Sequence, residues 1–220
     1  MRRLTLVAGL VGSPLFLLAY FVIYPAYGEV HGDDLARAVS SAQTQTQIAD
    51  LFAYTGVFLA VPATLAFMMV LRPRSPRLAA IGGSLAIVGW VALSGALTLD
   101  LVAVEIGDQP TLFQRVYENP VVVTLNSLAG LHVLGAVLIG VALVRTRILA
   151  RPLALAMTAA PVVHLAANLA GQLWLDALTW LTTALGGAVI AGRLGSDNRS
   201  ESVGSIIGVK DSQDLPAALR

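Results

Sequence analysis

Four polar residues at the end of a long apolar stretch recur at intervals of four, and their side chains could bind a ligand or carry protons. They are His164, Asn168, Gln172 and Asp176. Residues four apart on a helix drift by about 40° per step, so the spacing predicts one continuous polar stripe. Polar groups facing lipid are costly, and we therefore expect the stripe to face other helices or water. A water-lined pathway and interhelical hydrogen bonding both fit the pattern.

A second histidine, His132, lies in the preceding apolar stretch. Counted from the cytoplasmic ends of their stretches, His132 and His164 both fall roughly 18 Å deep, near the middle of a bilayer. Three interpretations stay open: a bis-histidine haem site, a proton-relay or ligand-binding pair that uses histidine's titration near neutrality, and two packed, hydrogen-bonded imidazoles. Because two histidines are the minimum for such a haem, we expect no cofactor, with haem as the exception to test.

One acidic residue, Asp100, lies near the outer end of another apolar stretch. With Glu105 and Asp176 it could form an acidic vestibule that attracts cations or protons, although a solvated carboxylate at the membrane surface is the commoner case. Ionisable residues within a span are functional candidates by default. The candidates for a ligand or proton pathway are therefore His164, Asn168, Gln172, Asp176, His132 and Asp100. They form no complete catalytic constellation, so catalytic residues stay unassigned and we lean against an enzyme.

The composition indicates what kind of protein must position these residues. Of 220 residues, 56% are hydrophobic and only 12% are charged, about half the charged fraction of a soluble domain. A net charge of +1 provides no basic field for nucleic acid. The absence of cysteine removes disulfides and thiolate metal sites, and we expect no metal site. The expected partners are the lipid bilayer and a small-molecule ligand, and no oligomeric state follows from the sequence.

Six apolar windows are close to the length that a transmembrane helix needs, about 20 residues. They predict an all-α, polytopic membrane protein whose single domain, residues 1–193, is a bundle of six transmembrane helices. The windows are about 4–24, 51–71, 78–99, 121–144, 153–171 and 177–191. The last window is short, so five spans plus a re-entrant segment is the alternative. Residues 194–220 are rich in Ser, Asp and Gly, which predicts a disordered cytoplasmic tail.

The arginines predict how the bundle is oriented. With the N-terminus inside, nine arginines lie at cytoplasmic ends and two lie outside, an asymmetry typical of the positive-inside rule. The nine are Arg2, Arg3, Arg72, Arg74, Arg77, Arg145, Arg147, Arg151 and Arg193, against Arg37 and Arg115. Both termini are therefore expected in the cytoplasm. Thirteen arginines against one lysine suggest a GC-rich bacterial genome, and hence a multi-pass protein of the bacterial inner membrane.

The layout of residues 45–105 places two apolar spans on either side of an Arg-Pro-Arg-Ser-Pro turn at 72–76. This layout resembles small multi-pass membrane proteins of GC-rich bacteria that have no defined activity, and the resemblance implies no functional residues. Three functions stay open: binding or moving a small molecule or protons through a polar cavity between the fourth and fifth helices, haem-based redox chemistry at His132 and His164, and a non-catalytic accessory or scaffold role.

Overall fold

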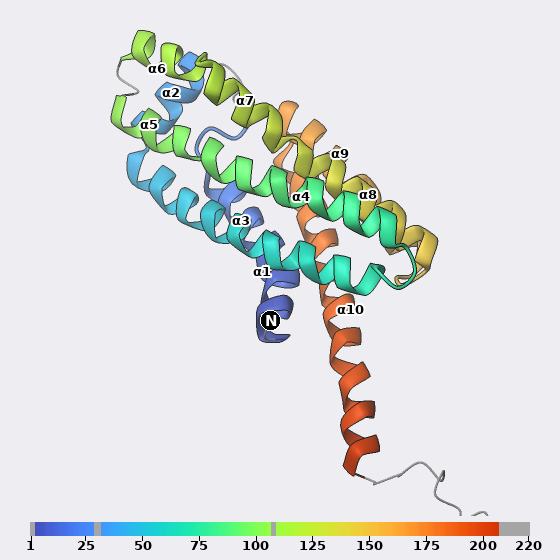
Figure 1. The fold of residues 1–220 in the computed structure, drawn as a ribbon. Helices are drawn as coiled ribbons and strands as arrows, with labels where there is room; N and C mark the ends of the chain where they lie inside the picture. Colours follow the sequence, from blue (N-terminus) through green and yellow to red (C-terminus); the bar gives the residue numbers. More distant parts are fainter. Residues whose placement is uncertain (1–2, 29–31, 107–108, 207–220) are drawn as a thin grey trace, which may run out of the picture.

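The computed structural model describes residues 3–28, 32–106 and 109–206, and all regular structure in these ranges is helical (Figure 1). The helices are α1 (Arg3–Ile23), α2 (Gly32–Ser41), α3 (Gln43–Leu71), α4 (Pro76–Ala96), α5 (Thr98–Ile106), α6 (Pro110–Tyr117), α7 (Pro120–Ala129), α8 (Leu131–Thr146), α9 (Arg151–Leu169) and α10 (Leu173–Ile206). Six segments are long and apolar enough to cross a membrane: Thr5–Ile23, Gln43–Leu71, Pro76–Ile106, Pro120–Thr146, Arg151–Leu169 and Leu173–Leu194. The predicted six-helix bundle is confirmed.

Two spans extend well beyond their apolar windows at one end of the bundle. α3 begins at Gln43, eight residues before the window that starts at Leu51. The third span combines α4 and α5 across a turn at Leu97 and continues to Ile106. Asp50 and Asp100 therefore lie inside helices and are buried. The interpretation of Asp100 as a solvated carboxylate at the membrane surface is therefore wrong, because α5 places its side chain inside the bundle.

α9 ends at Leu169, and the predicted polar stripe ends with it. Gly171 has a φ of 63°, a conformation that glycine adopts readily. The backbone N–H of Gln172 donates to the backbone carbonyl of Ala167 at 2.8 Å. These features form a glycine-terminated helix end. The chain then reverses into α10, which carries Asp176 in its first turn. The prediction of one continuous helical stripe is wrong beyond Asn168, and α10 is a long helix, not a short re-entrant segment.

α10 also extends past the predicted start of the tail. Its helix continues through Ile206, twelve residues beyond Leu194, so the helical part of the chain is longer than the sequence predicted. The remainder of the predicted tail, residues 207–220, lies outside the described residues, as do residues 29–31 of the first loop.

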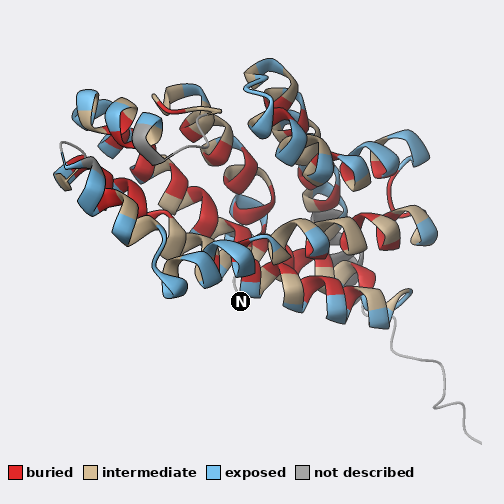
Figure 2. Ribbon diagram, turned by 90° about the horizontal axis from the view of Figure 1, so that it is seen from above, coloured by how far each residue is buried: buried red, intermediate tan, exposed pale blue. Residues whose placement is uncertain are grey.

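Alanines are frequent among the buried residues of the bundle, and Figure 2 shows buried residues along the inner faces of the helices. A Cβ atom added at Gly135 of α8 would lie 2.3 Å from the backbone nitrogen of Ala86 in α4, so these two helices touch backbone to backbone. Such close approach is typical of helix packing in lipid. Leu51 and Phe58 are each 68% exposed on α3, as expected for side chains that face acyl chains.

The two ends of the bundle differ in composition and construction. We call the end with the start of α1, the turn at 72–75 and the turn at 147–150 the arginine end (Figure 1). At the opposite end, the cap end, α2, α5 and α6 pack around Phe113, which is 1% exposed. The candidate functional residues lie in the half of the bundle nearer the cap end.

Candidate functional site

Both membrane histidines line one cavity of about 170 Å³ in the middle of the bundle, which we call the histidine cavity. Its wall is made by Leu17, Tyr20 and Phe21 of α1, Ala53 and Val57 of α3, Trp90, Leu93 and Leu97 of the third span, His132 of α8, His164 of α9 and Trp180 of α10. All six spans therefore contribute to the site, whereas the sequence had pointed to the fourth and fifth alone. His132 and His164 are close enough to interact electrostatically.

His164 forms its strongest contact with Asp176. The Nδ1–H of His164 donates to Oδ1 of Asp176 at 2.6 Å, and the carboxylate is 0% exposed. Tyr27 donates its hydroxyl proton to Oδ2 at 3.1 Å, and the hydroxyl of Thr179 is shared between the backbone carbonyl of Asp176 at 2.7 Å and Oδ1 at 3.3 Å. A buried carboxylate that accepts several hydrogen bonds is stabilised where an isolated one would not be. Because Nδ1 is the donor, Nε2 is the nitrogen of His164 that can bind a ligand or exchange a proton.

The α9–α10 hairpin and the chain after α1 bring the partners of Asp176 together. The helix end at Gly171 turns α10 back against α9, so Asp176 returns to the level of His164. Gly28 has a φ of 83°, and a Cβ atom there would lie 2.8 Å from the Cα of Gly171. Only glycine permits this approach, which holds Tyr27 over Asp176. Burial and the adjacent carboxylate raise the pKa of Tyr27, which therefore stays a protonated donor.

His132 is fixed by different contacts. Its ring stacks on the indole of Trp90, with ring centroids 4.4 Å apart and planes 30° from parallel. Its Nδ1–H donates to the carbonyl of Ala129 at 2.5 Å. A Cβ atom at Gly89 would lie 2.1 Å from the backbone nitrogen of His132, so the glycine of α4 gives α8 the room to place this histidine in the cavity.

A second, larger cavity of about 360 Å³ lies toward the cap end, and we call it the vestibule. It shares Tyr20, Phe21, Leu93 and Leu97 with the histidine cavity. Asp100 lines it and accepts hydrogen bonds from Tyr24 at 2.8 Å and Tyr20 at 3.5 Å. Burial, the charge of Asp100 and this hydrogen bond raise the pKa of Tyr24. Asn126 and Asn168 also line the vestibule.

Asp50 is the buried carboxylate without partners. It is 2% exposed, and neither of its oxygens has a hydrogen-bond partner in the described part of the chain. It lies close enough to Asp100, Tyr20 and Tyr24 to interact with them electrostatically. A bare buried carboxylate is expensive, so the charge at this position calls for a proton or a cation.

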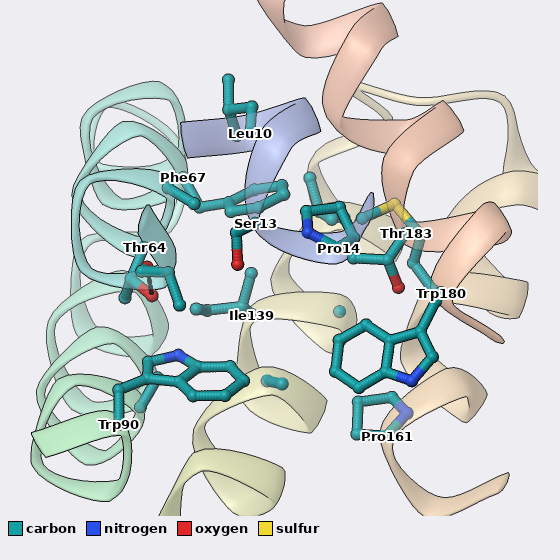
Figure 3. A pocket seen from close by; sticks show the side chains of 17 residues that line it. Leu10, Ser13, Pro14, Thr64, Phe67, Trp90, Ile139, Pro161, Trp180 and Thr183 are labelled. Carbon is teal, nitrogen blue, oxygen red and sulfur yellow. Dashed lines mark hydrogen bonds between the residues drawn. The ribbon is translucent and has the colours of Figure 1, made fainter. Parts of the chain in front are cut away.

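A third cavity, the apolar cavity of about 100 Å³, lies on the arginine side of the histidine cavity (Figure 3). Trp90 and Trp180 line both cavities, and Figure 3 shows their indoles on opposite sides at one end of it. Pro14 and Pro161, each inside a helix, contribute to its wall. The Nε1–H of Trp180 is buried and has no acceptor among the described residues, so it can donate to a bound molecule.

The structure brings most of the sequence candidates together. His132, His164 and Asp176 meet at the histidine cavity, and Asn168 and Asp100 line the vestibule. Gln172 is separate, because it is exposed in the hairpin and accepts a hydrogen bond from the indole of Trp174 at 3.1 Å. The residues that sequence reasoning missed are Tyr20, Tyr24, Tyr27, Asp50, Trp90 and Trp180. Tyr20 and Tyr24 are four residues apart, a spacing that could have revealed them, whereas Tyr27 lies in the turn beyond the end of α1 at Ile23.

Comparison of the chain with protein-family models, with curated proteins and with solved structures finds no match. The fold and the cavities therefore define the class that can be stated, a helical bundle with six segments able to cross a membrane and an interior polar site.

Proposed function

We propose that this protein is a multi-pass protein of the bacterial inner membrane that binds a small molecule, and moves it or protons, through the vestibule and the histidine cavity. In this proposal both termini lie in the cytoplasm and the cap end faces outward. The arginine distribution supports the orientation, since the arginine end carries the turns at 72–75 and 147–150.

One observation carries the proposal: two histidines, from different spans, line the same interior cavity. Polar groups of this kind are costly in the middle of a membrane protein and are retained where they bind something. The vestibule adjoins the histidine cavity across Tyr20, Phe21, Leu93 and Leu97, so in this proposal a ligand from outside passes these side chains to reach the histidines. Trp90 and Trp180 then separate the ligand from the apolar cavity beyond.

The pair of His164 and Asp176 suits a proton-linked step. Asp176 orients the imidazole through Nδ1, so a proton is gained or lost at Nε2, on the ring that lines the cavity. His164→Ala should therefore abolish proton-linked movement or ligand binding while the bundle still forms. A bound ligand whose affinity is unchanged by this substitution would contradict the role of His164.

Cysteine labelling tests whether the vestibule is open to water from outside. The chain has no cysteine, so a thiol reagent reports only the introduced residue. Asn168→Cys should react with a membrane-impermeant methanethiosulfonate added to intact cells, because Asn168 lines the vestibule. Leu165→Cys is the matched control on the same helix. Leu165 is 48% exposed on the bundle surface and should stay unreactive in lipid, where the thiolate does not form.

Orientation is checked with the same reagent. Arg74→Cys, in the turn between α3 and α4, should react only after the cytoplasmic face is opened. Failure of Asn168→Cys to react from outside, with Arg74→Cys behaving as expected, would mean that the vestibule is closed and would overturn the proposal. Reaction of Arg74→Cys in intact cells would reverse the orientation.

The shared cavity also bears on the haem alternative. Each imidazole already contacts an indole, His132 on Trp90 with centroids 4.4 Å apart and His164 on Trp180 at 4.9 Å. The cavity that both histidines line is only about 170 Å³, too small for a macrocycle, so the residues present do not fit a bis-histidine haem. The purified protein, expressed with haem supplied, should show no Soret absorption band.

A further inference from the structure

The vestibule and the histidine cavity combine aromatic rings with acidic groups. Tyr20 and Phe21 line both cavities, Trp90 and Trp180 line the deeper one, and Tyr24 lines the vestibule. Aromatic faces attract cations, and alkylated ammonium groups are recognised by enclosures of such rings. No Arg or Lys is among the described residues that line either cavity.

The buried charged residues also favour a cationic ligand. In the described part of the chain the buried Asp, Glu, Lys and Arg side chains are all acidic: Asp50, Asp100 and Asp176. Asp176 is paired with His164 through a hydrogen bond of 2.6 Å. Asp100 accepts only from neutral tyrosines, and Asp50 has no partner. The region where α1, α3 and α5 meet therefore holds two buried carboxyl groups with no basic partner, and either a proton or a cation in the vestibule would relieve their charge.

We propose that the ligand of this site is a small organic cation, an alkylated ammonium compound whose charged group lies in the vestibule among Tyr20, Tyr24 and the carboxylate of Asp100. This inference rests on the proposed function, since it names the ligand class of the same cavities. A divalent metal is disfavoured because no three His, Asp or Glu side chains gather as ligands within the described ranges.

Choline and 3,3-dimethylbutan-1-ol form a matched pair of probes, because they differ only in a charged nitrogen against a neutral carbon. The full chain in detergent should unfold at a higher temperature with rising choline concentration, while the neutral alcohol has no effect. Equal stabilisation by both probes would overturn the inference, since an apolar site would then suffice. Stabilisation by sodium chloride but not by choline would also overturn it, in favour of an inorganic cation.

Variants locate the binding. Asp100→Asn should weaken choline binding by about tenfold or more, because it removes a buried counter-charge. Glu105→Gln is the matched control, an exposed carboxylate on the same helix, and should bind choline as the wild type does. Unchanged binding in Asp100→Asn would contradict the placement of the cation.

Two variants of Tyr24 test the same proposal if Asp100→Asn does not fold. Tyr24→Phe retains an aromatic face and should bind choline within a few-fold of the wild type, whereas Tyr24→Leu should bind several-fold more weakly. Equal affinity of the two variants would argue against ring recognition. Reaction of Asn168→Cys from outside together with an absence of choline binding would reject the ligand class and leave the proposed pathway standing, so the two failures are distinguishable.

Discussion

Two buried carboxylate sites lie in the same half of the bundle and differ in how completely they are paired. Asp176 accepts hydrogen bonds from His164, Tyr27 and Thr179, so it is satisfied without any ligand. Asp50 has no partner, and Asp100 beside it accepts only from tyrosines. A satisfied site supports the fold, whereas an unsatisfied one carries a cost that a proton or a cation relieves. The contrast separates the group that positions His164 from the groups that we propose to bind the ligand.

The largest expected change in stability comes from substituting Asp176, the carboxylate whose hydrogen bonds are satisfied. Asp176→Ala removes the acceptor of His164 and Tyr27, while Thr179 keeps its hydrogen bond to the backbone carbonyl at this position. The substitution should lower the free energy of unfolding by about 3 kcal/mol. Reversible unfolding in mixed micelles measures this change. Asp176→Asn, which keeps the shape and one acceptor oxygen, should fall between the alanine variant and the wild type. Loss of less than about 0.5 kcal/mol in Asp176→Ala would mean that the pairing contributes little, as some interhelical hydrogen bonds do.

At Asp50, the carboxyl group without partners, a substitution should stabilise the protein instead of destabilising it. Asp50→Asn replaces a carboxylate without partners by a neutral amide, which is less costly to bury, and should raise the free energy of unfolding by about 1 kcal/mol without ligand. The same unfolding measurement applies, with Glu105→Gln, an exposed carboxylate, as a control expected to change nothing. A destabilisation comparable to that of Asp176→Ala would erase the difference between the two sites.

The smallest expected effect is a pH dependence of the stability that Tyr27 contributes at the Asp176 site. Tyrosines of the unfolded chain ionise near pH 10, while the pKa of Tyr27 in the folded protein is raised by burial and Asp176. The stabilising contribution of Tyr27 is therefore complete below about pH 10 and is lost as the pH rises toward its folded-state pKa. The stability difference between wild type and Tyr27→Phe should shrink from about pH 8 to about pH 11.

Thr179→Val provides the control for the tyrosine series. It also removes a hydrogen bond to Asp176 but no ionisable group, so its stability difference from the wild type should be the same at both pH values. A Tyr27→Phe difference that is equally constant would show that Tyr27 does not titrate differently in the folded and unfolded chains.

The six spans could be predicted because lipid demands long apolar segments, but the first turns of α3 could not. The segment from Gln43 to Asp50 is too polar for a hydropathy window. It is helical because it packs against the cap, where Gln43 donates to the Val104 carbonyl at 3.1 Å and Thr46 is 0% exposed. That tertiary packing is invisible in local composition, so the apolar window that starts at Leu51 excludes Asp50 and gives no sign that it lies near Asp100.

The pairing of His164 and Asp176 shows a different limit of sequence reasoning. Spacing placed both on one helical face, whereas a hairpin joins them, because Gly171 ends α9 and α10 returns alongside. The same hairpin removes Gln172 from the interior. Periodicity along a helix cannot anticipate a reversal that rests on one glycine in a left-handed conformation.

The central claim is that the vestibule is open to water and selects positive charge. Reaction rates of Asn168→Cys with a trimethylammonium methanethiosulfonate and a sulfonate methanethiosulfonate test it most directly, each divided by the rate of the same reagent with free 2-mercaptoethanol. The acidic, aromatic wall predicts a normalised rate about tenfold higher for the cationic reagent, with the preference reduced in Asp100→Asn and kept in Glu105→Gln. Equal normalised rates, or a faster reaction with the sulfonate, would contradict the account.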